Sequence, residues 1–348
     1  MAKPRNDDNF FNKLFRCTFL GESYLIFFIL IMYGISFAAA GNWVAELFSH
    51  FQVQYIIFLT LFGVITLMFA FNWRMAILAF GAASYSGYTI MPQINFNKEE
   101  HATISVYDRP LKIVQFNLQN SGRDQRGVTE WVSSTGLKDY DVLVLQEASP
   151  KMQDLIEYVK GVYPYSIDKT NEGNFGTLVL SRLELRNIET LQTGSAWPNY
   201  ILRFDVTKEG MGQDIRVFSL HTPPPVSSAV AKARNGQLAT VASYINQDDS
   251  ALKVLIGDLN LTPYSPYFKK LLDDSGLNYM QQSSIVVPEG TWPSFTFAPF
   301  LQIPIDHVLV SNGLIVDLER LSETSGSDHH PVVASIIKKR VDAIVQHP

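Results

Sequence analysis

The sequence predicts a mixed α and β domain, in which a sheet core is covered by helices, behind an N-terminal region of membrane-spanning helices. Three observations support this fold class. The stretch between Asp8 and Lys98 contains long uncharged runs, and its only charged residues are Lys13, Arg16, Glu22, Glu46 and Arg74. After it, short apolar runs rich in Val, Ile and Leu alternate with helical candidates. Several of these apolar runs end in a polar residue that is capable of chemistry.

The uncharged runs follow a basic start, and each is long enough to cross a membrane. They are Ser23–Ala45, Phe51–Trp73 and Met75–Asn97, and a transmembrane helix needs about 20 residues. The third run contains Gly81 and Pro92, so it either crosses or forms a buried or re-entrant segment. A cleaved signal peptide is the alternative for the first run, but the second run follows directly and favours a multi-span anchor. We therefore predict an anchor of about three transmembrane helices over residues 1–92.

Basic residues predict the orientation of this anchor. Lys and Arg residues precede the first run, Arg74 lies between the second and third runs, and residues 41–50 carry neither. Because cytoplasmic loops are enriched in Lys and Arg, the N-terminus should lie in the cytoplasm. With three spans the rest of the chain lies outside the cytoplasm, and with two spans it lies inside. We expect an integral protein of the cell membrane, with N-terminal helices in contact with membrane lipids and an extracytoplasmic domain.

Residues 93–110 are polar and without a strong period, which predicts a linker. Residues 111–340 have the pattern of one mixed domain, which suits sheets covered by helices. The predicted strands are Leu111–Phe116, Val142–Leu145, Thr177–Leu180, Ile201–Val206, Ile215–Leu220, Val254–Ile256, Ile305–Val310 and Pro331–Ile337. The predicted helices are Ser149–Lys160, Ser227–Asn246 and Tyr267–Ser275.

Composition excludes two classes of protein. The single cysteine, Cys17, rules out an intramolecular disulfide framework. The formal net charge is −5, and the part after Pro92 has more acidic than basic residues. A broad polyanion-binding surface is therefore not indicated.

The segment V-L-I-G-D-L-N-L-T-P, Val254–Pro263, has the pattern of a buried strand whose tip carries polar groups. Asp258 and Asn260 are two residues apart, so on an extended chain they point the same way while Leu259 points into the core. This predicts a site at the strand end. The alternative is turn chemistry followed by a helix N-cap.

Other predicted strands also end in polar residues, which are Asn117, Glu147 and His221. Near the C-terminus, Asp306 stands at the start of a predicted strand, and Asp328, His329 and His330 come just before another. Each of them alone has a structural explanation, as a cap, a strand-end charge or a satisfied core histidine. Together they favour a common site.

These motifs, in this order and spacing, resemble the endonuclease/exonuclease/phosphatase superfamily, which has the deoxyribonuclease-I-like fold. The main motifs are Asn117, L-Q-E at Leu145–Glu147, G-D-L-N at Gly257–Asn260, I-D-H at Ile305–His307 and S-D-H-H-P at Ser327–Pro331. Supporting segments are G-N-F-G-T-L-V-L-S-R at Gly173–Arg182 and A-R-N-G-Q-L at Ala233–Leu238. Membrane-anchored bacterial members of this superfamily have a similar G-D-L-N-x-T-P-x-S-P segment. The resemblance implies an α+β fold, a four-layered αββα sandwich, and divalent-metal-dependent hydrolysis of phosphoesters.

The resemblance also implies roles for the individual residues. Glu147 and Asn117 would bind Mg2+ or Mn2+, and Asp328 would add a second carboxylate directly or through water. Asp258 would orient and deprotonate the attacking water, and Asn260 would hold the phosphate or the attacking oxygen.

Two histidines take the family's histidine positions. His329, with Asp306 as its carboxylate partner, would face the phosphate as a donor. His221 would protonate the leaving oxygen or bind the phosphate. His307 and His330 lie beside the expected positions, and the spacing S-D-H-x-P favours His329.

The substrate stays open at this point, and the hydrolysed bond is either a phosphodiester or a phosphomonoester. The phosphoester is carried either by nucleic acid, as for a nuclease, or by a phospholipid headgroup, as for a phospholipid or sphingolipid phosphodiesterase. A non-catalytic membrane-tethered interaction module is the rival of another class. The uncharged stretch Thr291–Pro304 precedes Asp306, and its aromatic rings either pack beneath their loop or contact the membrane interface.

Overall fold

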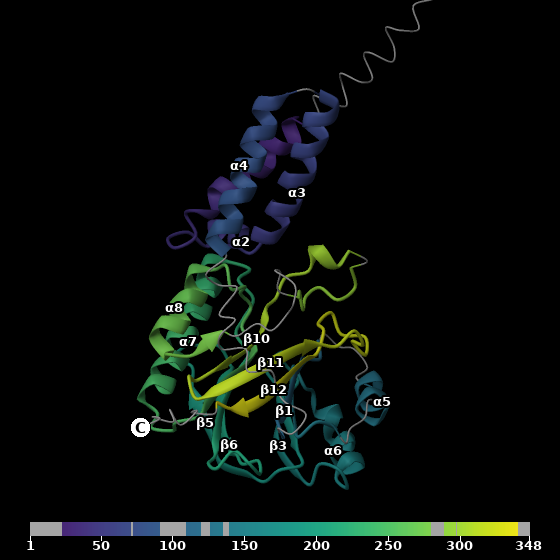
Figure 1. Ribbon diagram of the computed structural model, residues 1–348. Helices are drawn as coiled ribbons and strands as arrows, with labels where there is room; N and C mark the ends of the chain where they lie inside the picture. The colour runs from purple at the N-terminus through teal and green to yellow at the C-terminus, as the bar shows by residue number, and fades with distance from the viewer. Residues whose placement is uncertain are drawn as a thin grey trace, which may run out of the picture. The chain divides into compact units, whose positions relative to one another are not determined.

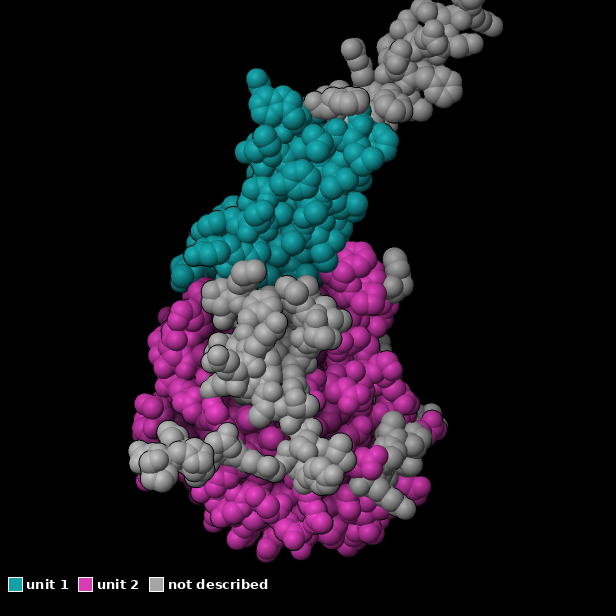
Figure 2. Space-filling model, viewed as in Figure 1, with its two compact units in different colours: residues 1–92 teal, residues 93–348 magenta. Residues whose placement is uncertain are grey.

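The computed structural model of the chain describes residues 23–70, 72–90, 109–119, 126–134, 139–279, 289–296 and 298–339. The basic residues before the first uncharged run and most of the predicted linker lie outside this description. The chain divides into two compact units, residues 1–92 and 93–348, which Figure 2 colours separately.

The first unit is helical. It contains a helix Ser23–Ser36, α2 (Trp43–Ser49), α3 (Gln52–Ile65), a π-helical segment Thr66–Ala70 and α4 (Trp73–Ile90). Its core includes Ile26, Tyr33, Tyr55, Leu59 and Ala79. Buried polar groups also join these helices, because the Ser86 hydroxyl of α4 donates to Gln52 Oε1 of α3 over 2.9 Å.

The helix boundaries differ from the predicted spans. The run Ser23–Ala45 is not one helix, because the helix from Ser23 ends at Ser36 and α2 begins at Trp43. Asn42 causes the new start, since its side chain caps α2 by accepting from the Val44 and Ala45 amides. Among the described residues, one helical stretch, Gln52–Phe69, is long and apolar enough to cross a membrane.

The second unit contains two six-stranded mixed sheets between helices (Figure 1). The strands of the first sheet, in spatial order, are β11 (Leu314–Arg320), β12 (Val332–Lys338), β1 (Leu111–Asn117), β2 (Val142–Gln146), β4 (Thr177–Ser181) and β3 (Tyr165–Lys169). Those of the second are β5 (Leu185–Gln192), β6 (Tyr200–Val206), β7 (Ile215–Leu220), β8 (Lys253–Asp258), β10 (Asp306–Val310) and β9 (Asn278–Tyr279). Each sheet has one parallel pair at its centre, β1 with β2 and β7 with β8, and antiparallel neighbours.

Alternating side chains divide the unit into four layers. Along β1, Leu111 and Ile113 enter the core between the sheets, whereas Val114 and Phe116 face the helices. The outer face of the first sheet is covered by α5 (Arg126–Ser134) and α6 (Gln153–Val159). That of the second is covered by α7 (Ser228–Gln247) and α8 (Pro266–Ser275). The α+β prediction of sheets flanked by helices is therefore confirmed for this unit.

Local sequence explains where the two helices that cover the second sheet begin and where α8 ends. The Ser227 hydroxyl caps α7 by accepting from the Val230 amide. Helix α8 begins with Pro266 after the N-cap Ser265, and it ends at Gly276, which has the left-handed conformation with φ of 68°.

The parallel pairs bring their carboxyl ends to one side of the sandwich. On β1 and β2 the inward-facing positions at that end are Gln115, Asn117 and Gln146, and each is buried. The backbones of β7 and β8 approach closely there, because a Cβ at Gly257 would lie 2.0 Å from the Leu220 carbonyl oxygen. Glycine is therefore required at this position of the G-D-L-N motif.

Candidate active site

The side chain of Asp258 lies at the centre of a group of polar residues from both sheets. Its Oδ2 accepts a hydrogen bond of 3.0 Å from Asn117 Nδ2, which also donates to Glu147 Oε1 over 3.2 Å. His221 Nε2 lies 3.6 Å from the same Asp258 oxygen and 3.8 Å from Glu147 Oε1. His329 Nε2 lies 3.7 Å from it on another side. Residues predicted from separate strand ends thus surround one carboxylate oxygen.

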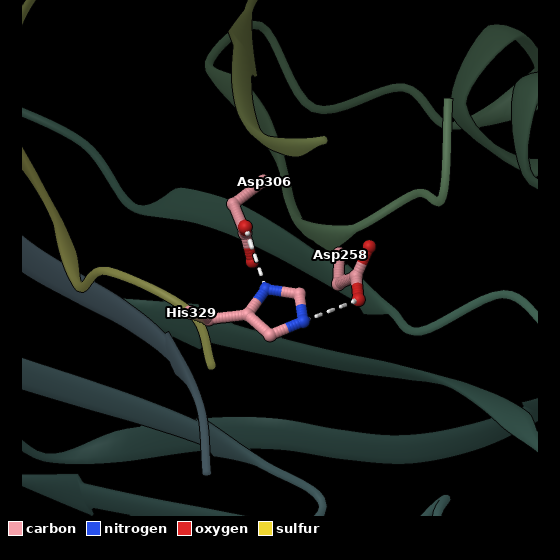
Figure 3. A group of neighbouring side chains, drawn as sticks. All are labelled: Asp258, Asp306 and His329. Carbon is pink, nitrogen blue, oxygen red and sulfur yellow. Dashed lines mark hydrogen bonds and ion pairs between the residues drawn. The ribbon is translucent and has the colours of Figure 1, made fainter. Parts of the chain in front are cut away.

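Asp306 and His329 form a hydrogen-bonded pair beside Asp258 (Figure 3). His329 Nδ1 lies 2.9 Å from Asp306 Oδ2, so the other ring nitrogen, Nε2, faces Asp258. The neighbouring histidines lie elsewhere. His307 packs against Phe268 on the outer face of the sheet, and the Nδ1 atom of His330 contacts the Leu321 carbonyl oxygen.

Burial and crowding of charge perturb the ionisation of these groups. Burial and repulsion from Asp306 raise the pKa of Asp258 to about 8. Burial would lower the pKa of His329, but the Asp306 carboxylate and its hydrogen bond raise it to about 10. Burial disfavours the charged form of Asp306, yet His329 holds the pKa of that carboxyl below its usual range. Burial, with repulsion from His329, lowers the pKa of His221 to about 4.

A family model described as Endonuclease/Exonuclease/phosphatase family matches residues 114–329, which is more than half of the chain. The chain belongs to this family. Residues Asn117, Glu147, His221, Asp258 and Asp306 all lie within the matched segment, and His329 ends it.

Solved structures of low sequence identity share the fold. D. rerio TDP2 complexed with single-strand DNA product has a TM-score of 0.53 at 16% identity, over 66% of this chain and 100% of that chain. A family protein from Bacteroides thetaiotaomicron also has a TM-score of 0.53 at 16% identity, over 66% of this chain and 98% of that chain. Beta toxin from Staphylococcus aureus has a TM-score of 0.51 at 18% identity, over 66% of this chain and 100% of that chain. No curated protein matches the chain.

The carboxylates of the site suit a divalent cation, as expected in this family. The Glu147 side chain is 14% exposed, and the residue has the unusual positive φ of 55° for a non-glycine residue. Asp328 Oδ1 is buried without a hydrogen-bond donor among the described residues, and it lies 3.9 Å from His329 Nε2. An anionic oxygen of this kind is stabilised by a bound cation.

A different group of potential metal ligands also lies close together. One ligand atom from each of Asp258, Asp306 and His329 lies within 4.8 Å of the others. However, Asp306 Oδ1 accepts from Gln115 Nε2 over 2.9 Å and Oδ2 pairs with His329, so both oxygens already have partners. We therefore favour the Glu147 side of the site for the cation, and a positioning role for Asp306.

Two buried glutamines, Gln115 and Gln146, hold Asp306 and Asp258 in place through hydrogen bonds. The sequence alone did not assign them a function. Gln115 donates to Asp306 Oδ1 and, over 3.1 Å, to Gln146 Oε1. The same Gln146 oxygen accepts the Asp258 amide over 2.8 Å. Gln115 stands two residues before Asn117 on the same face of β1, and this spacing was the available signal.

Asn260 is held in place rather than pointing freely into the site. It has a positive φ of 48°, its amide donates to Asp258 Oδ1, and its side-chain Nδ2 donates to the Thr222 carbonyl over 2.8 Å. The buried guanidinium of Arg234 donates to the Asn260 carbonyl over 2.9 Å. Asn260 thus orients Asp258, and its predicted contact with the phosphate stays a prediction.

The aromatic side chains of the stretch before Asp306 differ in how far they are buried. Trp292 is half-buried, and its Nε1 donates to Asp328 Oδ2 over 3.1 Å. Phe295 and Phe300 are 78% and 47% exposed. Phe297 lies outside the described residues.

Proposed function

We propose that the chain is a divalent-metal-dependent phosphodiesterase, with nucleic acid as the leading class of substrate. The observation that supports this proposal is the arrangement of Asn117, His221 and His329 around Asp258 Oδ2, at 3.0 to 3.7 Å. Glu147 Oε1 lies next to this group, 3.2 Å from Asn117 Nδ2 and 3.8 Å from His221 Nε2. Such a group can move a proton and stabilise developing negative charge at one point. Family membership supports the same reaction class.

In the proposed reaction the ionised form of Asp258, which is favoured above its pKa of about 8, accepts the proton of the attacking water. Its carboxylate is oriented for this role by the Asn260 amide and the Asn117 side chain. His329 donates through Nε2 to a phosphoryl oxygen, because Asp306 holds its Nδ1. His221 donates a hydrogen bond to the phosphate or to the leaving oxygen.

Glu147, Asn117 and Asp328 would hold magnesium or manganese. The bound cation would polarise the phosphoryl oxygen and offset the charge that develops on it. The chain's own contribution is to fix Glu147 through Asn117 and Asp328 through Trp292.

Hydrolysis of bis(p-nitrophenyl) phosphate by the full-length chain tests the assignment. Activity should disappear with a chelator and return with Mg2+ or Mn2+, and Glu147→Gln should weaken metal activation most. Asp258→Asn and His329→Ala should each lower kcat by about 10² to 10⁴ with unchanged circular dichroism. The matched controls are Glu157→Gln and Asp273→Asn, which change acidic residues in exposed ion pairs and should keep activity.

The rival reading is a non-catalytic interaction module that keeps the fold. A panel of DNA, RNA, phosphodiester lipids and inositol phosphates under magnesium separates the two. Hydrolysis of none of them by the folded chain would favour the module.

A lipid phosphodiesterase is the second candidate, and the exposure of Phe295 and Phe300 favours it. Large exposed aromatic rings suit a membrane interface. The double variant Phe295→Ser and Phe300→Ser should then lose liposome binding and lipid hydrolysis, with a soluble diester unaffected. Equal loss on both substrates would indicate a packing role instead.

We further propose that residues 1–92 anchor the enzyme in the cell membrane with the catalytic unit outside the cytoplasm. Support comes from the stretch Gln52–Phe69 and from large apolar side chains exposed on the first unit, among them Phe28, Met68, Phe69 and Ile77. A reporter that works only outside the cytoplasm, fused after Pro348, should be active. A reporter active only in the cytoplasm would mean that an even number of spans precedes the catalytic unit.

A further inference from the structure

Two aromatic rings lie beside His221, and the proposed reaction does not use them. The Phe175 ring centroid is 5.1 Å from that of His221 and 5.9 Å from that of Trp197. His221 Nε2 is in turn 3.8 Å from Glu147 Oε1. The Phe175 ring therefore lies next to the place where the substrate phosphate would bind, and the Trp197 ring lies beside Phe175.

The backbone around Phe175 is tied to the segment that follows Glu147. The Gly176 carbonyl accepts the Ala148 amide over 3.1 Å, and the Asn171 amide donates to the Ala148 carbonyl over 3.3 Å. A Cβ at Gly176 would lie 2.1 Å from the Ala148 oxygen, so this close approach requires glycine. Phe175 is therefore fixed relative to Glu147.

Trp197 lies on the loop between β5 and β6, which belong to the second sheet. Its amide contacts Ser195 Oγ over 3.4 Å, and that oxygen accepts from Gln237 Nε2 over 2.7 Å. The nearby Asn199 donates to the His221 carbonyl over 2.8 Å. The Trp197 loop and His221 are thus held by one hydrogen-bond network.

We propose that Phe175 and Trp197 form an aromatic wall that binds a planar ring on one ester group of the substrate phosphate. Both rings are half-buried, so they keep accessible surface, and they meet edge to face at an interplanar angle of 80°. Fixed aromatic rings bind planar rings by stacking at a low cost in conformational entropy. The proposal rests on the proposed phosphodiesterase function, because the wall is placed by its distance from the phosphate site.

The wall predicts which class of substrate is preferred. Nucleobases and aryl groups carry planar rings, and stacking on aromatic side chains tolerates different bases. Common phospholipid headgroups carry none. A strong preference for a planar ring would therefore favour the nucleic-acid class over the lipid class.

Two substrates that differ only in the ring test the wall on the full-length chain with magnesium. These are benzyl methyl phosphate and cyclohexylmethyl methyl phosphate, and the readout is the ratio of their kcat/KM values. We expect the wild type to favour the benzyl ester by about 5- to 20-fold. Trp197→Leu and Phe175→Leu should each bring the ratio close to 1. Tyr158→Leu, at an exposed ring on α6, is the matched control and should keep the wild-type ratio.

A wild-type ratio near 1, or a ratio that both wall variants leave unchanged, would overturn the proposal. Failure to hydrolyse either ester would count against the phosphodiesterase function instead. In that case calorimetric titration with benzyl and cyclohexylmethyl methylphosphonate tests the wall separately. Tighter binding of the benzyl compound, lost in both wall variants, would support the wall, and equal Kd values would refute it.

Discussion

Replacing Arg216 with methionine should destabilise the second unit strongly, although Arg216 lies near the end of β7 that is remote from the candidate site. The guanidinium makes two hydrogen bonds of 2.7 Å to Asp205 and one of 2.6 Å to Asp248. The Arg216 side chain is 19% exposed, and both carboxylates are 4% exposed. The variant would therefore leave two nearly buried negative charges without their main partner. The expected loss in the free energy of unfolding is about 3 kcal/mol, at the lower end of the range for broken buried pairs.

The dependence on pH gives a second test of the same network. Burial would raise the pKa of Asp205, but the hydrogen bonds from Arg216 hold it below the usual range, and the same holds for Asp248. The stabilisation by this network is present above the unfolded carboxyl pKa, about 4, and is lost as pH falls through the lower folded pKa. In Arg216→Met this stabilisation is missing. The difference in stability between wild type and variant should therefore be largest near pH 7 and shrink below about pH 4.

Urea unfolding followed by tryptophan fluorescence measures both quantities. The matched control is Arg186→Met, because Arg186 pairs with Asp214 over a similar 2.6 Å while the two side chains are 43% and 38% exposed. An exposed pair of this kind contributes less than about 1 kcal/mol. Equal losses in the two variants, or a loss in Arg216→Met that grows on acidification, would refute the reasoning.

Two further substitutions test individual contacts at the site. Gly257→Ala should lower the free energy of unfolding by about 3 kcal/mol, because its methyl group would meet the Leu220 carbonyl at 2.0 Å; Gly161→Ala, with no atom within 4 Å of the added carbon, should be close to neutral in the same urea titration. Trp292→Phe removes the donor to Asp328 Oδ2, so half-maximal activity should need about 10-fold more magnesium while kcat at saturating magnesium is kept. Unchanged metal activation in that variant would separate Asp328 from the cation.

Sequence patterns predicted the interior of the sheets and missed their edges. The predicted strands correspond to β1, β2, β4, β6, β7, β8, β10 and β12, which are the interior strands of the two sheets. The strands β3, β5, β9 and β11 were not predicted, and they are the edge strands. Interior strands are buried on both faces and read as apolar runs, whereas β5 is exposed along most of its length. The polar, mostly exposed edge strands β3 and β5 have no such signal.

The same physics explains which site residues could be predicted. Asn117, Glu147 and Asp258 stand out because each follows an apolar run, and the structure brings them together, although their roles in catalysis stay predictions. Gln115 and Trp292 stand inside apolar segments, where a polar atom can be satisfied in many ways. Only the three-dimensional contacts connect Gln115 to Asp306 and Trp292 to Asp328.

The candidate site is built from both sheets. In each sheet the parallel pair lies at the centre. The first sheet supplies Asn117 as the last residue of β1 and Glu147 directly after β2. The second supplies His221 directly after β7 and Asp258 as the last residue of β8. The contacts cross between the sheets, since Asn117 bonds Asp258 over 3.0 Å and His221 faces Glu147 at 3.8 Å. In the proposed mechanism, neither sheet holds the complete set of proton-transfer and cation-binding groups. The separation of the proposed catalytic groups is therefore set by the apolar core between the sheets.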